Sequence, residues 1–114
     1  MHEMSIAKNI IEIIKESVEE KDLVSIDKVV LKVGELSGVV PDSLQFSLEA
    51  ISYGTELEKV EYKMTKIPFV IKCKICNQES NNESGIIKCT VCGSKETEVV
   101  SGNELLVSEI ILKN

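Results

Sequence analysis

This chain of 114 residues contains no tryptophan, two tyrosines, two phenylalanines and one histidine. Because 43% of its residues are hydrophobic but few are aromatic, any core must be built from aliphatic side chains. A single histidine, at position 2, leaves no Ser/His/Asp constellation away from the terminus. The sequence also lacks the glycine-rich loops that bind nucleotide phosphates. We therefore expect no enzymatic activity.

Positive charge and long hydrophobic runs are also scarce. Lys and Arg number 13 against 19 Asp and Glu, which gives a net charge of −6. Nucleic-acid backbones are bound through many basic contacts, so we expect no nucleic-acid partner. Apolar runs such as residues 110–112 are far too short to span a bilayer. Glu3, Lys8 and Glu12 interrupt the N-terminal segment, which has no signal-peptide cleavage site. These features predict a cytoplasmic protein without a membrane partner.

The most specific pattern is formed by Cys73, Cys76, Cys89 and Cys92, which read C-x2-C, twelve residues, C-x2-C. Two such turns facing each other place four thiolates at the corners of a tetrahedron, the geometry of a structural zinc site. A site with four protein ligands has no open position for water or substrate. The pattern therefore predicts structural Zn²⁺ rather than a catalytic metal.

Other chemistries also use four cysteines. Disulfides form mainly in oxidising compartments, and a cytoplasmic location disfavours them. A rubredoxin-like iron centre or an iron–sulfur cluster takes the same four thiolates and remains an alternative. Thioredoxin-like redox chemistry needs one exposed C-x-x-C at a helix N-terminus, which two matched pairs do not resemble.

The residue after each cysteine pair supports two tight turns, which we call knuckles. Gly93 follows Cys92, and glycine adopts positive φ without steric cost. Asn77 follows Cys76, and asparagine is the next best residue in that conformation. We expect both positions to have positive φ.

Hydrophobic periodicity predicts the other elements. A helix is expected over residues 5–21 with Ser5 as N-cap, and a strand over residues 23–34 with one buried face at Val29, Leu31 and Val33. Pro41 suits the first position of a second helix, whose buried stripe is Leu44, Leu48 and Ile51 and whose C-cap is Gly54. Val60, Tyr62 and Met64 mark one face of a second strand, and the last strand covers residues 104–112.

The cysteine segment interrupts this series. Residues 69–102 contain all four cysteines and little apolar content, so a metal must replace a core there. The strand at residues 104–112 is too apolar for a free tail, and we expect it to return to the first sheet. The cysteine segment is therefore predicted to be an insertion.

The only histidine, His2, directly follows Met1. A terminal histidine is usually inert, because chain ends are rarely ordered. Here, however, the α-amine of Met1, the amide nitrogen of His2 and its imidazole Nδ1 can close adjacent chelate rings around one ion. A deprotonated amide favours a strong-field ion such as Ni²⁺ or Cu²⁺. The fourth donor could be the Glu3 amide, the Glu3 carboxylate, water or a partner.

Four segments form a specific combination: M-H-E-M-S-I-A at residues 1–7, V-G-E-L-S-G-V-V-P at 33–41, C-T-V-C-G-S at 89–94 and G-N-E-L at 102–105. In this order the chain resembles the HypA/HybF hydrogenase maturation factors over essentially its whole length. Two departures are Asn77, where the family often has Gly, and Thr90, where Pro is common.

The resemblance implies a nickel metallochaperone that delivers Ni²⁺ to apo [NiFe]-hydrogenase large subunit with the GTPase HypB, with urease as another client. It implies His2 as the nickel ligand, Glu3 as a supporting residue, and Cys73, Cys76, Cys89 and Cys92 as zinc ligands. Met1 is a further nickel ligand only on the chelate argument above.

Independently of the resemblance, the apolar edge of the predicted three-stranded sheet would allow either HypB docking or a homodimer. Domain swapping through the Pro68 junction is a third alternative.

The implied fold is α+β. It has a nickel domain (residues 1–68 plus 103–114) of two helices on a three-stranded mixed sheet, and an inserted zinc-ribbon-like domain (residues 69–102).

Two other functions remain alternatives. A zinc-ribbon adaptor would dock a protein or nucleic acid and leave His2 idle. An electron carrier would hold iron at the four thiolates. Acidic composition and the lack of interleaved aromatic residues weigh against nucleic-acid docking. The colour of the purified protein would distinguish iron from colourless zinc.

Overall fold

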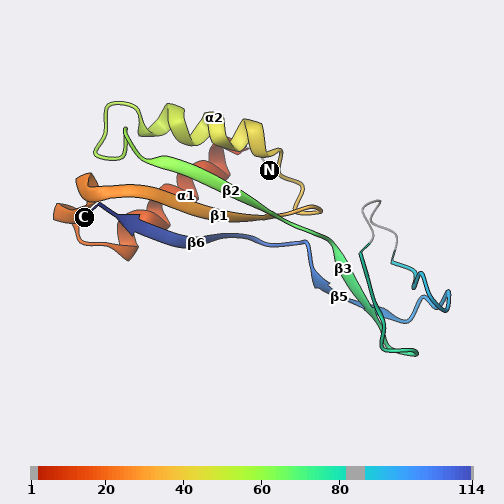
Figure 1. Ribbon diagram of the computed structural model, residues 1–114. Coiled ribbons are helices and arrows are strands. Elements are labelled where there is room, and N and C mark those ends of the chain that lie inside the picture. The colour runs from red at the N-terminus through yellow and green to blue at the C-terminus, as the bar shows by residue number, and fades with distance from the viewer. Residues whose placement is uncertain (1–2, 82–86, 114) are drawn as a thin grey trace. The chain divides into compact units, whose positions relative to one another are not determined.

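The computed structural model describes residues 3–81 and 87–113, so Met1 and His2 lie outside the described residues. Figure 1 shows the helices and strands. They are α1 (Glu3–Ser17), the 3-10 helix η1 (Glu20–Ser25), β1 (Ile26–Gly34), α2 (Pro41–Ser52), β2 (Glu61–Ile67), β3 (Val70–Cys73), β4 (Glu79–Asn81), β5 (Thr97–Ser101) and β6 (Leu105–Leu112). No helix among the described residues is both long and apolar enough to cross a membrane.

Packing divides the chain into two compact units. The first contains Met1–Lys32, Val39–Thr65 and Leu106–Asn114, and the second contains Val33–Gly38 and Lys66–Leu105. The domain boundaries predicted from the sequence differ from the boundaries of these two units. The main difference is that the prediction placed residues 33–38 in the nickel domain, whereas they pack in the unit that contains the cysteines. Those boundaries remain a prediction, because compact packing units need not be independent domains.

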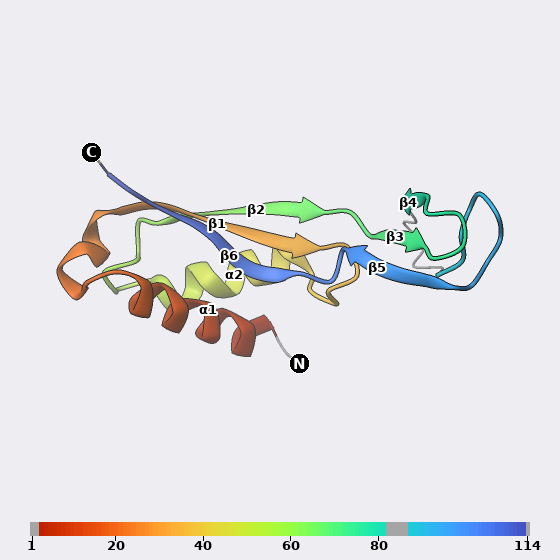
Figure 2. The ribbon, with the colours of Figure 1, turned by 90° about the horizontal axis from the view of Figure 1, so that it is seen from below.

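The first unit is built around a three-stranded sheet in the order β2-β1-β6, with β1 in the centre. In Figure 2 the arrows of β1 and β2 point the same way and β6 runs back, so the sheet is mixed. Both α1 and α2 lie on one face of this sheet and pack against each other. The predicted α+β fold, with β6 returning to the first sheet after the cysteine segment, is confirmed.

The core of the first unit is aliphatic, as the composition required. Val29 and Leu31 of β1 are fully buried and alternate with more exposed neighbours. The helices bury one stripe each, made of Ala7, Ile10, Ile14, Leu44 and Leu48. One polar pair is buried among them: the hydroxyls of Ser52 and Tyr62 lie 2.6 Å apart in a hydrogen bond. This pair satisfies two groups that would be costly to bury alone.

The predicted limits of the first helix were wrong. The helix already includes Glu3, so Ser5 is not its N-cap, and it ends at Ser17 rather than at residue 21. Apolar spacing locates the buried stripe of a helix but not its ends. Glu3 is favourable in the first turn because it complements the helix dipole. Glu19 is extended, and η1 then occupies the start of the predicted strand.

The second helix agrees better with the prediction from the sequence than the first helix does. Pro41 occupies its first turn, as expected. The predicted C-cap was one residue too late: Tyr53 is the C-cap, and Gly54, with a φ of 78°, directly follows it. Leu44 and Leu48 are buried, while Ile51 is only partly covered.

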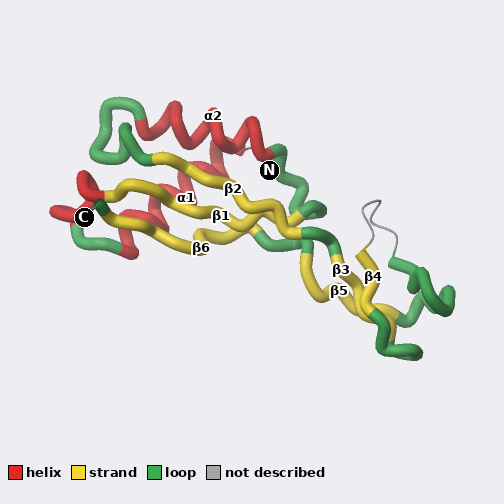
Figure 3. The backbone as a smooth tube through the Cα atoms, in the orientation of Figure 1, coloured by secondary structure: helices red, strands yellow, loops and turns green. Residues whose placement is uncertain are grey.

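The second unit contains a smaller sheet in the order β4-β3-β5, with both pairings antiparallel (Figure 3). Ile71 of β3 lies opposite Ser80 on one side and Val99 on the other. Among the described residues of this unit, the large buried side chains besides Val33 are Phe69, Ile71 and two cysteines. So small a core cannot supply much hydrophobic stabilisation.

Two glycines allow the 33–38 segment to approach the rest of this unit closely. Gly34 donates its N–H to the carbonyl of Glu104 at 2.7 Å, and Leu36 donates to the carbonyl of Gly102 at 2.8 Å. A Cβ atom on Gly34 would lie 2.1 Å from the Gly102 oxygen. Gly102 itself has a φ of 111°, and a Cβ there would lie 2.5 Å from the Cα of Phe69. Both positions therefore require glycine.

Glu35 fixes the same segment from its other side. Its backbone N–H donates to the carbonyl of Ile67 at 2.8 Å. Its carboxylate accepts the N–H of Phe69 at 2.8 Å, and Lys66 Nζ lies 3.8 Å from the second carboxylate oxygen. Since Lys66 is largely exposed, we assign most of the stabilisation to the hydrogen bond with Phe69.

Candidate metal centres

Each cysteine pair forms a tight backbone turn. We define the first knuckle as residues 73–78 and the second as residues 89–94. Asn77 donates its N–H to the carbonyl of Cys73, and Gly93 donates to that of Cys89, both at 3.0 Å. The φ angles are 63° at Asn77 and 77° at Gly93, so the predicted positive φ is confirmed at both positions. The two knuckles are thus the same local structure formed twice.

The backbone of each knuckle points N–H groups at its first sulfur. Cys73 Sγ accepts the N–H groups of the residues two and three positions later, at 3.4 and 3.5 Å. Cys89 Sγ accepts the equivalent pair at 3.3 and 3.4 Å. The Cys92 N–H, followed by that of Val91, lowers the pKa of Cys89 to about 6. The Cys76 N–H is likewise the main cause that lowers the pKa of Cys73. The thiols of Cys73 and Cys89 therefore lose their protons more readily than a free thiol.

The pKa values of the other two thiols, those of Cys76 and Cys92, are raised. The N–H of Gln78 lowers the pKa of Cys76, but burial and the neighbouring Cys89 and Cys73 together raise it to about 12. The N–H of Ser94 lowers the pKa of Cys92, but Cys73, burial and Cys89 together raise it above its usual value. Without a cation, four thiolates so close together would repel one another. A divalent metal would allow all four to ionise.

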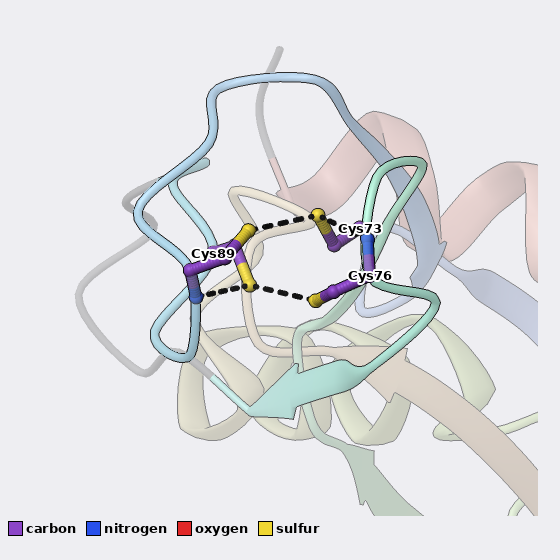
Figure 4. Close-up of side chains that lie close together, drawn as sticks. Cys73, Cys76 and Cys89 are labelled. Carbon is purple, nitrogen blue, oxygen red and sulfur yellow. Dashed lines mark hydrogen bonds between the residues drawn. The ribbon is translucent and has the colours of Figure 1, made fainter.

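The four sulfurs converge on one point. Cys73 Sγ lies 3.5 Å from Cys92 Sγ, and Cys76 Sγ lies 3.6 Å from Cys89 Sγ. All four lie within 4.8 Å of one another. Figure 4 shows the thiols of the two knuckles facing each other across this gap. A tetrahedron with metal–sulfur bonds of ~2.3 Å has edges of ~3.8 Å, whereas a disulfide bond is ~2.0 Å. The cluster therefore fits a metal such as zinc.

A contact that the sequence did not reveal joins the second knuckle to the sheet. The hydroxyl of Thr90 lies 2.9 Å from that of Ser80 on β4. The two residues are ten positions apart and no periodicity links them, so only the folded chain shows the hydrogen bond.

The predicted N-terminal site is only partly visible, because Met1 and His2 lie outside the described residues. Glu3 begins α1 and lines an open groove of 450 Å³ in the first unit. The groove is also lined by Met4, Asp42, Ser43, Phe46 and Ser47. Asp42 was not singled out from the sequence, because it lies 39 positions from Glu3 along the chain. The fold thus brings a second carboxylate to the groove that Glu3 lines.

Comparisons with known proteins agree on one family. The family described as "Hydrogenase/urease nickel incorporation, metallochaperone, hypA" matches residues 1–112. The hydrogenase maturation factor HypA of Aquifex aeolicus is 34% identical over 113 residues, covering 99% of this chain and 98% of that protein. HypA of Geobacter sulfurreducens is 37% identical over 110 residues, covering 96% and 97%.

Solved structures support the same fold. The solution structure of the Ni metallochaperone HypA from Helicobacter pylori superposes with a TM-score of 0.69 at 21% identity, covering 99% of this chain and 98% of that one. A second solution structure of HypA protein has a TM-score of 0.71 at 21% identity, covering 98% and 96%. At this identity the likeness concerns the fold alone. The near full-length sequence matches, however, show that this chain belongs to the HypA family of nickel metallochaperones for hydrogenase maturation.

Proposed function

We propose that this chain binds one Ni²⁺ at its N-terminus through His2 and delivers it to a [NiFe]-hydrogenase large subunit. The observation that carries the proposal is the match to a nickel-incorporation family, which begins at residue 1. The only histidine of the chain, His2, lies at this end. The donors are the imidazole and amide of His2, the Met1 amine, and the amide or carboxylate of Glu3. Delivery involves transfer of the ion and no catalysed reaction.

The start of α1 suits this chelate. The first four N–H groups of a helix have no acceptor within the helix. Because α1 begins at Glu3, the amide of Glu3 belongs to that set. A metal that binds there would break no intrahelical hydrogen bond. Asp42 lines the same groove as Glu3, so its carboxylate would be a further oxygen donor for an ion bound beside Glu3 or for water on that ion.

We further propose that Cys73, Cys76, Cys89 and Cys92 hold a structural Zn²⁺. The sulfur separations fit a tetrahedral ion, and the small core of the second unit needs a replacement for hydrophobic packing. We expect the protein to act in the cytoplasm with a HypB-type GTPase. Urease is a second client to be tested.

The first test is a calorimetric titration of untagged, zinc-loaded protein with Ni²⁺, carried out at about pH 7.5 and at about pH 5.5. Wild type should bind one Ni²⁺, and His2→Ala should lose this site while its zinc content stays unchanged. A free imidazole has a pKa of about 6.5, so protons compete with the metal and affinity should fall steeply at the lower pH.

Two control proteins separate the donors. A glycine added before Met1 should weaken binding by moving the amine, whereas Asp42→Asn should have a smaller effect. Equal nickel binding by wild type and His2→Ala would refute the site at the N-terminus. If nickel binding were lost only when the cysteines are substituted, the ion would bind at the cysteine cluster and not at the N-terminus.

A further inference from the structure

The β2-β1-β6 sheet of the first unit has one face covered by helices. In Figure 2 both α1 and α2 lie on the same side of this sheet, so neither of them covers the opposite face. A sheet with one face in water normally presents polar side chains there and alternates them with buried apolar ones. The residues on the uncovered face therefore indicate whether this face is adapted to solvent alone.

Backbone hydrogen bonds show which residues of β1 and β6 share a face. Gly34 donates its N–H to the carbonyl of Glu104, and Lys113 donates its N–H to the carbonyl of Ser25, both at 2.7 Å. These bonds lie at the two ends of the β1–β6 pair, and both fit a single antiparallel register. Residues that lie opposite each other in such a pair point to the same face of the sheet.

The register places a basic row beside an apolar row on the uncovered face. Residues 28, 30 and 32 of β1 point there, because Val29 and Leu31 between them are fully buried. Their partners on β6 are residues 110, 108 and 106. The pairs are Lys28 with Ile110, Val30 with Ser108 and Lys32 with Leu106. Two lysines thus lie next to two large apolar side chains, of which Leu106 is 44% exposed.

Strand β2 adds a third lysine to this face. Tyr62 is buried and forms a hydrogen bond with Ser52 of α2, so it points toward the helices. Because successive side chains of a strand alternate, Glu61 and Lys63 point the other way, and both are exposed. We define the open face as residues 28, 30, 32, 61, 63, 106, 108 and 110. It contains three lysines and one glutamate, a local charge of +2 on a chain whose net charge is −6.

The lysines of the open face are not neutralised by the protein itself. Within residues 3–81 and 87–113, Lys28, Lys32 and Lys63 take part in no ion pair. The helices have the opposite charge balance, because α1, η1 and α2 together contain seven acidic and three basic residues. The open face is therefore a positive and partly apolar surface on an acidic protein, and its charge is complementary to an acidic partner.

We propose that the open face binds an acidic amphipathic helix of a partner protein. The helix places carboxylates over the lysines of β1 and apolar side chains over the neighbouring row of β6. Lys28 and Lys32 are separated by ~13 Å along the strand, close to the ~12 Å between helical residues eight positions apart. This inference is independent of nickel and zinc binding.

The shape of the surface favours a helix over other occupants. An extended segment lying on the face would leave its own backbone N–H and C=O groups without partners, whereas a helix satisfies them internally. Helices already cover the other face of the same sheet. A nucleic acid is disfavoured, because three lysines neutralise few phosphates and the adjacent row on β6 is apolar.

A synthetic helical peptide of ~20 residues tests the proposal. It carries one stripe of glutamates beside one stripe of leucines, and the control peptide has lysine in place of every glutamate. Each peptide is titrated into isotope-labelled, zinc-loaded protein at low salt and followed by NMR. The glutamate peptide should shift the amides of β1, β2 and β6, and its affinity should fall as salt is added. The lysine peptide should not bind.

Two matched double variants locate the attraction. Lys28→Glu/Lys32→Glu should raise the dissociation constant of the glutamate peptide about tenfold or more. Lys8→Glu/Lys15→Glu reverses as many charges on α1 and should change the constant less than about twofold, because net charge acts weakly over distance in salt. Circular dichroism and zinc content verify that the variants are folded. Equal weakening by the two variants would overturn the proposal, since the attraction would then come from net charge.

Further outcomes separate the amphipathic helix from other anions. Leu106→Gln should raise the dissociation constant about threefold or more, and an unchanged constant would exclude an apolar contact with β6. Absence of binding by the glutamate peptide at millimolar concentration, or equal binding by the lysine peptide, overturns the proposal. Vesicles of phosphatidylglycerol and a single-stranded DNA oligonucleotide are tested with the same variants. Tighter binding of either through Lys28 and Lys32 would assign the open face to a membrane or a nucleic acid instead.

Discussion

At the scale of single residues, the most informative positions are those where only one or two residue types satisfy the backbone. Asn77 and Gly93 both have positive φ, and each closes a knuckle by donating its N–H to the first cysteine's carbonyl. Asparagine tolerates this conformation better than most residues but less well than glycine. The first knuckle therefore contains a strained backbone conformation at Asn77, whereas the equivalent conformation at Gly93 of the second knuckle is unstrained.

Substitution of Asn77 should reveal that strain. Asn77→Ala should destabilise the protein by about 1 kcal/mol, whereas Asn77→Gly should be neutral or slightly stabilising. Thermal melts of zinc-loaded protein with equal metal content measure the difference. If alanine and glycine gave the same melting temperature, the left-handed conformation would contribute nothing to stability.

Tyr62 provides a second prediction at this scale. Burial raises the pKa of the Tyr62 phenol above its usual value of about 10, although the hydrogen bond with Ser52 lowers it. The folded protein thus holds this proton more tightly than the unfolded chain. Its contribution to stability is complete below about pH 10, and it is lost as the pH rises from there through the folded pKa.

The measurement is urea unfolding at about pH 8 and about pH 11. Tyr62→Phe should cost about 1–2 kcal/mol at the lower pH, since the Ser52 hydroxyl loses its partner. Between the lower and the higher pH, the free energy of unfolding of Tyr62→Phe should also fall less than that of wild type. Tyr53→Phe is the control, because Tyr53 is 78% exposed. Equal alkaline losses in wild type and Tyr62→Phe would contradict the role of burial.

At the scale of elements, periodicity predicted which residues are buried better than where elements end. Val29 and Leu31 alternate as expected in β1, and Leu44 and Leu48 form the buried stripe of α2. The first helix, however, began earlier and ended earlier than predicted, and η1 was missed. Burial repeats along several turns and leaves a clear pattern, whereas an end depends on the few hydrogen bonds of one turn.

The 33–38 segment supplies a prediction for this scale. Gly34→Ala would force a Cβ against the Gly102 carbonyl, so it should destabilise the second unit by about 3 kcal/mol. Gly38→Ala is the matched control: its φ of 81° is strained for alanine, but no atom lies within 4 Å of the added carbon. It should cost only about 1 kcal/mol. Melting temperatures that fall equally would show that crowding at Gly34 is relieved elsewhere.

At the scale of the whole molecule, the two units differ in what stabilises them. The first has an aliphatic core from two helices and a sheet, while the described part of the second buries few large side chains and holds the cysteine cluster. If the cluster binds structural zinc, that ion stands where hydrophobic packing would otherwise be. The units should then respond differently to loss of metal.

Chelation of zinc should therefore unfold the second unit and leave the first largely intact. Amide exchange followed by NMR would show lost protection across β3 and β5, with protection retained in α1 and α2. Helical circular dichroism should change little. A cooperative loss of both units in one transition would contradict this expectation and indicate that the first unit depends on the metal as well.

The sequence by itself determined what depends on neighbours along the chain. Cysteine spacing and a residue that tolerates positive φ predicted both knuckles, periodicity predicted the buried faces, and the first residues indicated a metal-binding terminus. Only the tertiary structure brought Thr90 to Ser80, Asp42 to the groove of Glu3, and residues 33–38 into the second unit. Local backbone preferences act over a few residues and leave a signal in the sequence. Contacts between distant segments depend on the path of the whole chain, and no short pattern records them.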